Sequence, residues 1–146
     1  SDEIDRAKKI LSEFGDKIIL PDDLALLNES GERIECPANK VADNLPIFDI
    51  GQNSIERFSK LIRSSGTVVM NGPAGKFEEE NFAAGTESLV RAATLSKFSV
   101  IGGGHISAVV EELGLADRVS HISSGGGACL RYLAGEKLPG IEALMK

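Results

Sequence analysis

The chain has 146 residues and a formal net charge of −6, with 42% hydrophobic and 26% charged residues and a mean hydropathy of −0.02. This balance indicates a globular domain and excludes an intrinsically disordered chain. The acidic charge argues against binding nucleic acid or an anionic membrane through the whole surface, and no apolar run reaches the roughly 18 residues of a membrane span. No signal peptide is visible, and Cys36 and Cys129 lie far apart, so we expect free thiols and a cytoplasmic location.

The first third of the chain predicts a helix, a short strand and a small hairpin. Residues 2–14 place their apolar side chains on one helical face. The apolar triplet 18–20 predicts a short buried strand. In the polar stretch that follows, 34–36 is expected to form one arm of a hairpin with its turn at 29–31. The acidic pair 22–23 is expected to lie in a solvated loop.

Short apolar strands alternate with helices in the rest of the chain. The expected strands are 47–51, 67–70, 98–101 and 118–122. The expected helices are 53–64, 85–96, 105–113, 128–133 and 141–145, with an acidic helix start at 78–80. Asn53 or Ser54 is expected to cap the first of these helices. This alternation indicates βαβ units, so we predict a Rossmann-like α/β fold in which a parallel sheet lies between two layers of helices.

A glycine-rich turn follows each of three predicted strands, at 71–75, 102–104 and 123–127. The carboxyl ends of parallel strands meet at one edge of a sheet, so these turns can converge on one crevice. Glycine lets the backbone approach a ligand closely, and the following helix points free amides at it, which favours phosphate. No glycine pair here is followed by the Lys-Ser or Lys-Thr of a P-loop. Ser107 replaces the third glycine of a dinucleotide motif, which disfavours a nicotinamide cofactor without excluding it.

Four segments together resemble the phosphoglycerate kinase family. The segments 70–78, 100–104, 120–128 and 133–140 are similar in order and spacing to that family's glycine turns and closing segment, and 49–51 agrees upstream. The resemblance implies phosphoryl transfer between 1,3-bisphosphoglycerate and ADP, which gives 3-phosphoglycerate and ATP. It further implies that residues 1–146 are the later part of the carboxy-terminal, nucleotide-binding domain.

The resemblance also implies that members of the family have further segments with no counterpart in this sequence. The amino-terminal domain, which holds 3-phosphoglycerate, is absent, as is the start of the nucleotide domain. We therefore expect a sheet that is incomplete at its amino-terminal end, completed by another chain or a second copy. Little kinase activity is expected from these residues alone. The alternative is a non-catalytic nucleotide-binding or assembly module of the same fold.

The same resemblance assigns roles to individual residues. The amides of Gly125, Gly126 and Gly127 would face the phosphoryl group in flight, where positioned dipoles stabilise a loose transition state. Glu78 would bond the ribose and Asn71 would lie near the phosphates. The adenine and nucleotide pocket would be formed by Phe48, Pro73, Gly75 and Lys76, the stem of Lys76 packing against the base. The remaining nucleotide-binding positions would be Gly102, Gly103, Gly104, His105, Ile106 and Ser107.

Magnesium is expected to arrive with ATP or ADP, without a protein ligand of its own. Most bacterial and eukaryotic members have Asp-Thr where this chain has His105 and Ile106, and an imidazole is a poor ligand for Mg²⁺. His105 could instead donate to a phosphate or merely begin a helix, and a histidine here resembles archaeal members. His121 is expected to be a packed core histidine, and Asp49 either orients its turn or contacts a ligand's hydration shell.

Overall fold

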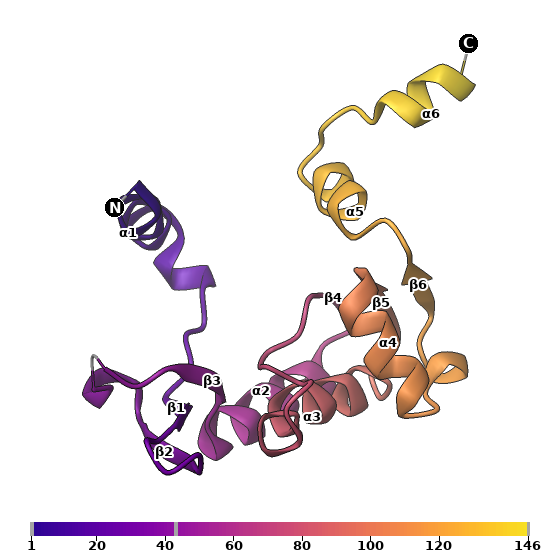
Figure 1. Cartoon of the computed structure of the whole chain (residues 1–146). Coiled ribbons are helices and arrows are strands. Elements are labelled where there is room, and N and C mark those ends of the chain that lie inside the picture. Colours follow the sequence, from indigo (N-terminus) through magenta and orange to yellow (C-terminus); the bar gives the residue numbers. More distant parts are fainter. Residues whose placement is uncertain (1, 43, 146) are drawn as a thin grey trace.

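The structure is a computed structural model that describes residues 2–42 and 44–145 (Figure 1). Its α-helices are α1 (Asp2–Phe14), α2 (Gln52–Ser64), α3 (Ala84–Ala93), α4 (Gly104–Glu112), α5 (Gly126–Leu133) and α6 (Pro139–Leu144). Its strands are β1 (Asp23–Leu27), β2 (Arg33–Pro37), β3 (Ile47–Ile50), β4 (Thr67–Asn71), β5 (Phe98–Gly102) and β6 (His121–Ser123). In Figure 1, α2 and α3 lie between β1–β3 at one end and β4, β5 and α4 at the other.

The first three strands form an antiparallel sheet in the order β2-β1-β3. Strands β1 and β2 are a hairpin in which Leu24 pairs with Cys36, and Gly31 adopts a left-handed φ of 80° in its turn. The predicted hairpin is therefore confirmed. The strand predicted over 18–20 is wrong: those residues pair with no described strand, and Ile19 is half exposed. The buried strand is β1 instead, because it is hydrogen-bonded on both sides.

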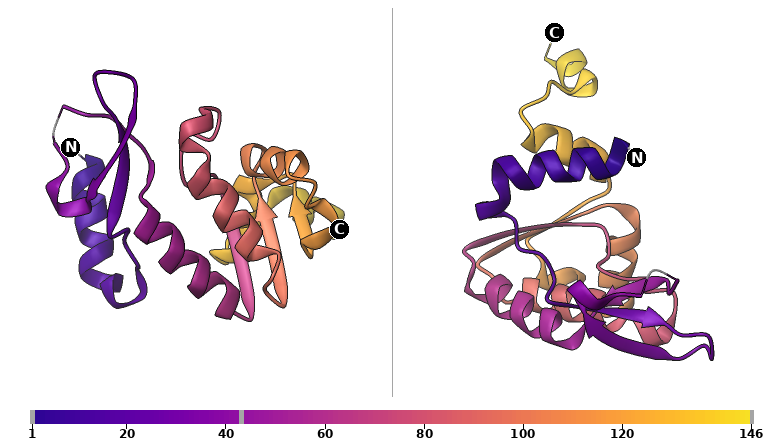
Figure 2. Two further views of the ribbon diagram at one scale, coloured as in Figure 1. Left: turned by 90° about the horizontal axis from the view of Figure 1, so that it is seen from below. Right: turned by 90° about the vertical axis from the view of Figure 1, so that its left-hand side faces the viewer.

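The last three strands form a parallel sheet in the order β4-β5-β6. Helices α3 and α4 pack on one face of it, around a core that contains Val90, Ile101, Ile106 and Val110. Figure 2 shows the same helices beside these strands from another viewing direction. The predicted α/β class with a parallel sheet flanked by helices is confirmed.

The opposite face of the parallel sheet is less covered in the described residues. Side chains alternate between the two faces of a strand, so Val68 and Met70 face the core while Val69 faces away. Val69 is 43% exposed and Phe98, on the same face, is 48% exposed. Helix α1 also carries exposed apolar side chains and buries no residue. No described helix is long and apolar enough to span a membrane.

Asp23 holds the start of α2 from outside the helix. Its side chain accepts hydrogen bonds from the backbone N–H of Asn53 at 3.0 Å and of Ser54 at 2.8 Å. Burial raises the pKa of Asp23, but these bonds and the Ser54 hydroxyl outweigh that effect and hold the pKa below 3.8. The predicted solvated loop is thus wrong for Asp23, which is 5% exposed. The predicted caps Asn53 and Ser54 are wrong as well, because both lie inside α2 and donate to Asp23 of β1.

Several element boundaries differ from the prediction. The acidic segment 78–80 leads into a short 3₁₀-helix, Glu80–Phe82, rather than into α3. Helix α3 ends at Ala93 and not at residue 96, and a 3₁₀-helix over Ala116–Arg118 delays β6. His121 is exposed at the start of β6, so its prediction as a core histidine is wrong. His121 pairs with Val100, so its side chain lies on the less covered face of the sheet, with those of Val69 and Phe98.

We expect Asp23→Ala to lower the free energy of unfolding by about 2 kcal/mol at pH 7, because amides at the start of α2 lose their acceptor. The contribution of Asp23 is complete above its unfolded-state pKa near 3.8 and is lost as pH falls through the lower folded-state value. Urea unfolding at a series of pH values should therefore show the difference from wild type shrinking in acid.

The matched control is Asp22→Ala, which removes the exposed neighbour that pairs with Arg57. That change should alter the unfolding free energy by less than about 0.5 kcal/mol. Equal losses in the two variants would contradict the capping role of Asp23.

Candidate functional site

The three predicted turns meet beyond the carboxyl ends of the parallel strands. Asn71, at the end of β4, donates its side-chain amide to the Gly126 carbonyl at 3.2 Å. The Gly103 amide donates to the Ser123 carbonyl at 3.2 Å, which joins the second turn to the third. The predicted convergence on one edge is therefore a feature of the structure.

Backbone fits directly against backbone where the second and third turns touch. A Cβ on Gly126 would lie 2.7 Å from the Cα of Gly103 and 2.9 Å from its nitrogen. Gly103 itself has a φ of 103°, a conformation that side-chain-bearing residues rarely adopt. Both positions therefore require glycine, one for space and the other for conformation.

The start of α4 is exposed at this edge and offers backbone amides. The first bond of the helix runs from the Ser107 amide to the Gly103 carbonyl at 3.1 Å. The amides of Gly104, His105 and Ile106 precede that bond, so the helix itself does not use them. The Ser107 hydroxyl donates to the same carbonyl at 2.8 Å, which assigns Ser107 a structural contact. Helix α5 begins in the same way at Gly126, so Gly126 and Gly127 lie in its first turn.

A cavity of about 400 Å³ lies beside the first turn. It brings together four residues predicted for the nucleotide pocket: Phe48, Pro73, Gly75 and Lys76. The Lys76 ammonium lies 4.5 Å from the centre of the Phe48 ring, and the ammonium also pairs with Glu79 at 3.0 Å. Glu78 is exposed in the following turn and does not line this cavity.

Thr86 fixes one wall of this cavity, and sequence analysis did not identify it. Its buried hydroxyl accepts the amides of Ala74 at 3.1 Å and Gly75 at 3.2 Å. The Lys76 amide donates to the Phe48 carbonyl at 2.6 Å. The backbone of this loop is therefore already hydrogen-bonded, so it shapes a wall and does not offer these amides to an anion. A threonine early in a helix and soon after a glycine turn was the available signal.

The turns offer no carboxylate for a divalent cation. Residues 71–75, 102–107 and 123–128 contain amides, hydroxyls and the exposed imidazole of His105, and no Asp or Glu. Within 2–42 and 44–145, no group of three or more His, Cys, Asp or Glu side chains could hold a metal ion. Because Mg²⁺ prefers oxygen ligands, the residues present do not fit a directly bound Mg²⁺.

Parallel strands whose carboxyl ends carry glycine turns define the class of α/β proteins that bind ligands at this edge. The sequence model of the family described as phosphoglycerate kinase matches residues 1–136. The chain belongs to the phosphoglycerate kinase family, as the resemblance of its four motifs indicated.

Individual relatives agree over nearly the whole chain. The phosphoglycerate kinase of Methanosarcina mazei is 54% identical over 144 residues, which cover 98% of this chain and 34% of that protein. The crystal structure of phosphoglycerate kinase from Pyrococcus horikoshii matches with a TM-score of 0.87 and 38% identity, over 99% of this chain and 36% of that one. The Coxiella burnetii enzyme matches with a TM-score of 0.86, 34% identity, and coverage of 97% and 38%. The chain thus spans about a third of the length of these relatives.

We expect Gly126→Ala to push the second and third turns apart, because its methyl group would overlap the backbone of Gly103. The loss of unfolding free energy should be about 1–3 kcal/mol, typical of overpacking. Urea unfolding measures the loss, and backbone amide NMR shifts of Gly103 and Asn71 report the displacement.

Gly127→Ala is the control, since a Cβ on Gly127 would meet nothing within 4 Å. This neighbour in the same helix should be neutral or stabilised by up to about 1 kcal/mol. Equal behaviour of the two variants would show that the turns are not in the tight contact described.

Proposed function

We propose that this chain is the nucleotide-binding part of a phosphoglycerate kinase, which transfers a phosphoryl group between 1,3-bisphosphoglycerate and ADP to give 3-phosphoglycerate and ATP. The observation that carries the proposal is the meeting of three glycine turns at one sheet edge, beside a cavity lined by Phe48 and the loop 73–76. The whole enzyme would act in glycolysis in the cytoplasm, and its other domain would hold 3-phosphoglycerate.

The geometry supports separate positions along this edge for the nucleoside and for the phosphates of the nucleotide. The cavity has an aromatic ring and a hydrogen-bonded wall, which suit a base and its sugar. The start of α4, at the exposed Gly104 and His105, offers amides and the positive end of a helix to the phosphates. Ile106, predicted for the same role, is completely buried and would support this helix start from the core. The exposed turn at Gly125, with the first residues of α5, would face the transferred phosphoryl group.

Glu78 and Asn71 have different support in this proposal. Asn71 holds the third turn through Gly126, and this contact supports its proposed position near the phosphates. Glu78 is exposed next to the loop and would bond a ribose from outside the cavity. Since the turns hold no carboxylate, magnesium would be bound by the nucleotide's own phosphates.

We expect ADP to bind this chain, since the cavity wall and both helix starts are formed in the structure. Titration followed by backbone amide NMR should shift Phe48, Gly75 and Lys76 together with Gly104 and His105. Inorganic phosphate alone should shift only the residues at the helix starts. Absence of any shift at millimolar ADP would overturn the proposal.

Turnover is a separate question from binding. In a coupled assay with ATP and 3-phosphoglycerate, we expect little activity from this chain, because removal of one stabilising cation costs about 10³–10⁵ in phosphoryl-transfer rate. Near-normal turnover would contradict this expectation. Nucleotide binding that no added partner or domain converts into turnover would instead favour a non-catalytic nucleotide-binding module.

A further inference from the structure

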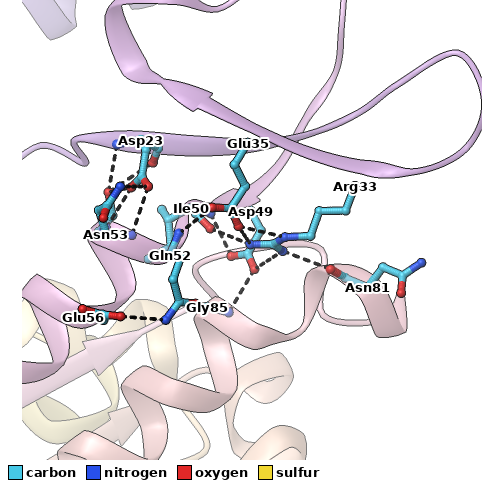
Figure 3. A network of polar contacts seen from close by, with 11 residues as sticks. Asp23, Arg33, Glu35, Asp49, Ile50, Gln52, Asn53, Glu56, Asn81 and Gly85 are labelled. Atoms are coloured by element: carbon cyan, nitrogen blue, oxygen red, sulfur yellow. Dashed lines mark hydrogen bonds and ion pairs between the residues drawn. The ribbon is translucent and has the colours of Figure 1, made fainter.

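Arg33 in β2 joins the hairpin to β3 and to the 3₁₀-helix Glu80–Phe82 that precedes α3 (Figure 3). Its guanidinium pairs with Glu35 at 2.8 Å and with Asp49 at 3.1 Å. It also donates to the carbonyls of Ile50 and Asn81, at 3.1 and 3.0 Å. Burial lowers the pKa of Arg33, but Glu35 and Asp49 outweigh this effect and raise it above its ordinary value. The guanidinium is thus a fixed cation at the junction of the hairpin and α3.

Asp49 lies at the centre of this junction, with its side chain completely buried. It accepts the Gly85 amide at 2.9 Å, in the first turn of α3, and its own neighbour's amide, that of Ile50, at 2.8 Å. A Cβ on Gly75 or on Gly85 would overlap the carboxylate. The carboxylate is therefore wedged between the cavity wall and the start of α3.

A second line of contacts runs from Arg33 to the cavity through aromatic rings. The Arg33 guanidinium lies 5.6 Å from the centre of the Phe82 ring. Phe82 meets Phe48 edge to face at 5.0 Å, and the Lys76 ammonium covers Phe48 at 4.5 Å. Such contacts fix ring orientation. Arg33 therefore reaches both walls of the cavity: Gly75 through Asp49, and Phe48 through Phe82.

Stability alone does not explain this arrangement. Replacing a buried ion pair by apolar side chains of similar size is often neutral or stabilising, because two charges must be removed from water. The charged pair supplies directional contacts instead. The Asp49 carboxylate holds the Gly85 amide, and its oxygen leaves no room for a side chain at Gly75. Both effects act on the position of the loop 73–76.

Asp49 is among the residues that line the cavity, but its carboxylate is completely buried. We propose that the side chains of Arg33 and Asp49 are a positioning pair for the nucleoside end of the site, setting nucleotide affinity through Gly75 and Phe48 without touching the ligand themselves. The proposal rests on the proposed function, since the nucleotide is the ligand that the cavity would hold. It extends that function to a hairpin residue distant from the glycine turns. Rotation of Phe48 or displacement of Gly75 would misplace the base, and small displacements in a site have large effects on binding and rate.

The test compares Asp49→Asn with Asp23→Asn in the 146-residue chain. Each change neutralises one buried carboxylate that accepts amides at the start of a helix, but only Asp49 touches the cavity loop. At equal folded fraction, measured by circular dichroism, we expect Asp49→Asn to raise the Kd for ADP about tenfold. Asp23→Asn should leave the Kd within about twofold of wild type.

A measurement without ligand separates this proposal from the proposed function. Hydrogen exchange at the amides of Gly75 and Lys76 should accelerate in Asp49→Asn and stay unchanged in Asp23→Asn. Wild-type chain that does not bind ADP would refute the proposed function, while the exchange rates would still test the positioning of the loop. Unchanged exchange in Asp49→Asn, or equal changes of Kd in the two variants, would overturn the positioning role.

Arg33→Met provides a second variant if Asp49→Asn fails to fold. Methionine keeps much of the packing volume over Phe82 but removes the cation. We expect it to raise the Kd for ADP in the same direction and to shift the Phe48 ring resonances. Arg33→Lys keeps a charge but loses the planar fork, so it should give an intermediate Kd. Wild-type Kd in both Arg33 variants would contradict the proposal.

Discussion

Helices α2 and α3 begin without a capping side chain of their own, and the antiparallel sheet caps both. Asp23 of β1 accepts amides at the start of α2, and Asp49 of β3 accepts an amide at the start of α3. A carboxylate in such a place is favoured both by hydrogen bonding and by the positive end of the helix. Since α3 shares one buried core with α4 and β5, these two buried carboxylates connect the antiparallel sheet to the parallel one, and the cavity lies between the two.

Backbone amides at the sheet edge are divided between two uses. Those of Ala74 and Gly75 are bound by the Thr86 hydroxyl, so they form a fixed wall. Those of the exposed Gly104 and His105, like those at the start of α5, precede the first bond of their helix and stay available to an anion. One edge can therefore hold an uncharged ring and a charged group side by side, without a lysine or arginine in any of the three turns.

Local patterns predicted the parallel half well, because each of its strands is apolar and ends at a glycine turn. They fail around residues 18–27, because they predict a strand over the apolar triplet 18–20 and none over β1. Only the pairing of β1 with two distant strands buries it, and pairing is not visible in a local window. The solvated loop predicted at Asp23 is wrong for the same reason: the amides that donate to its carboxylate lie some thirty residues away. The family resemblance predicts the cavity residues. It does not predict Thr86 and Arg33, because their roles depend on tertiary contacts that no sequence motif contains.

The wedge of Asp49 between two glycines has a consequence for how this sequence can vary. Positions 49, 75 and 85 are far apart in the chain but share one small volume. Alanine at 75 or 85 needs space that only a shorter residue at 49 would release, and a shorter residue at 49 abandons the Gly85 amide. The three positions therefore form one unit of substitution: changes that are harmful singly can be compatible in combination, and a library that varies them one at a time would miss every such solution.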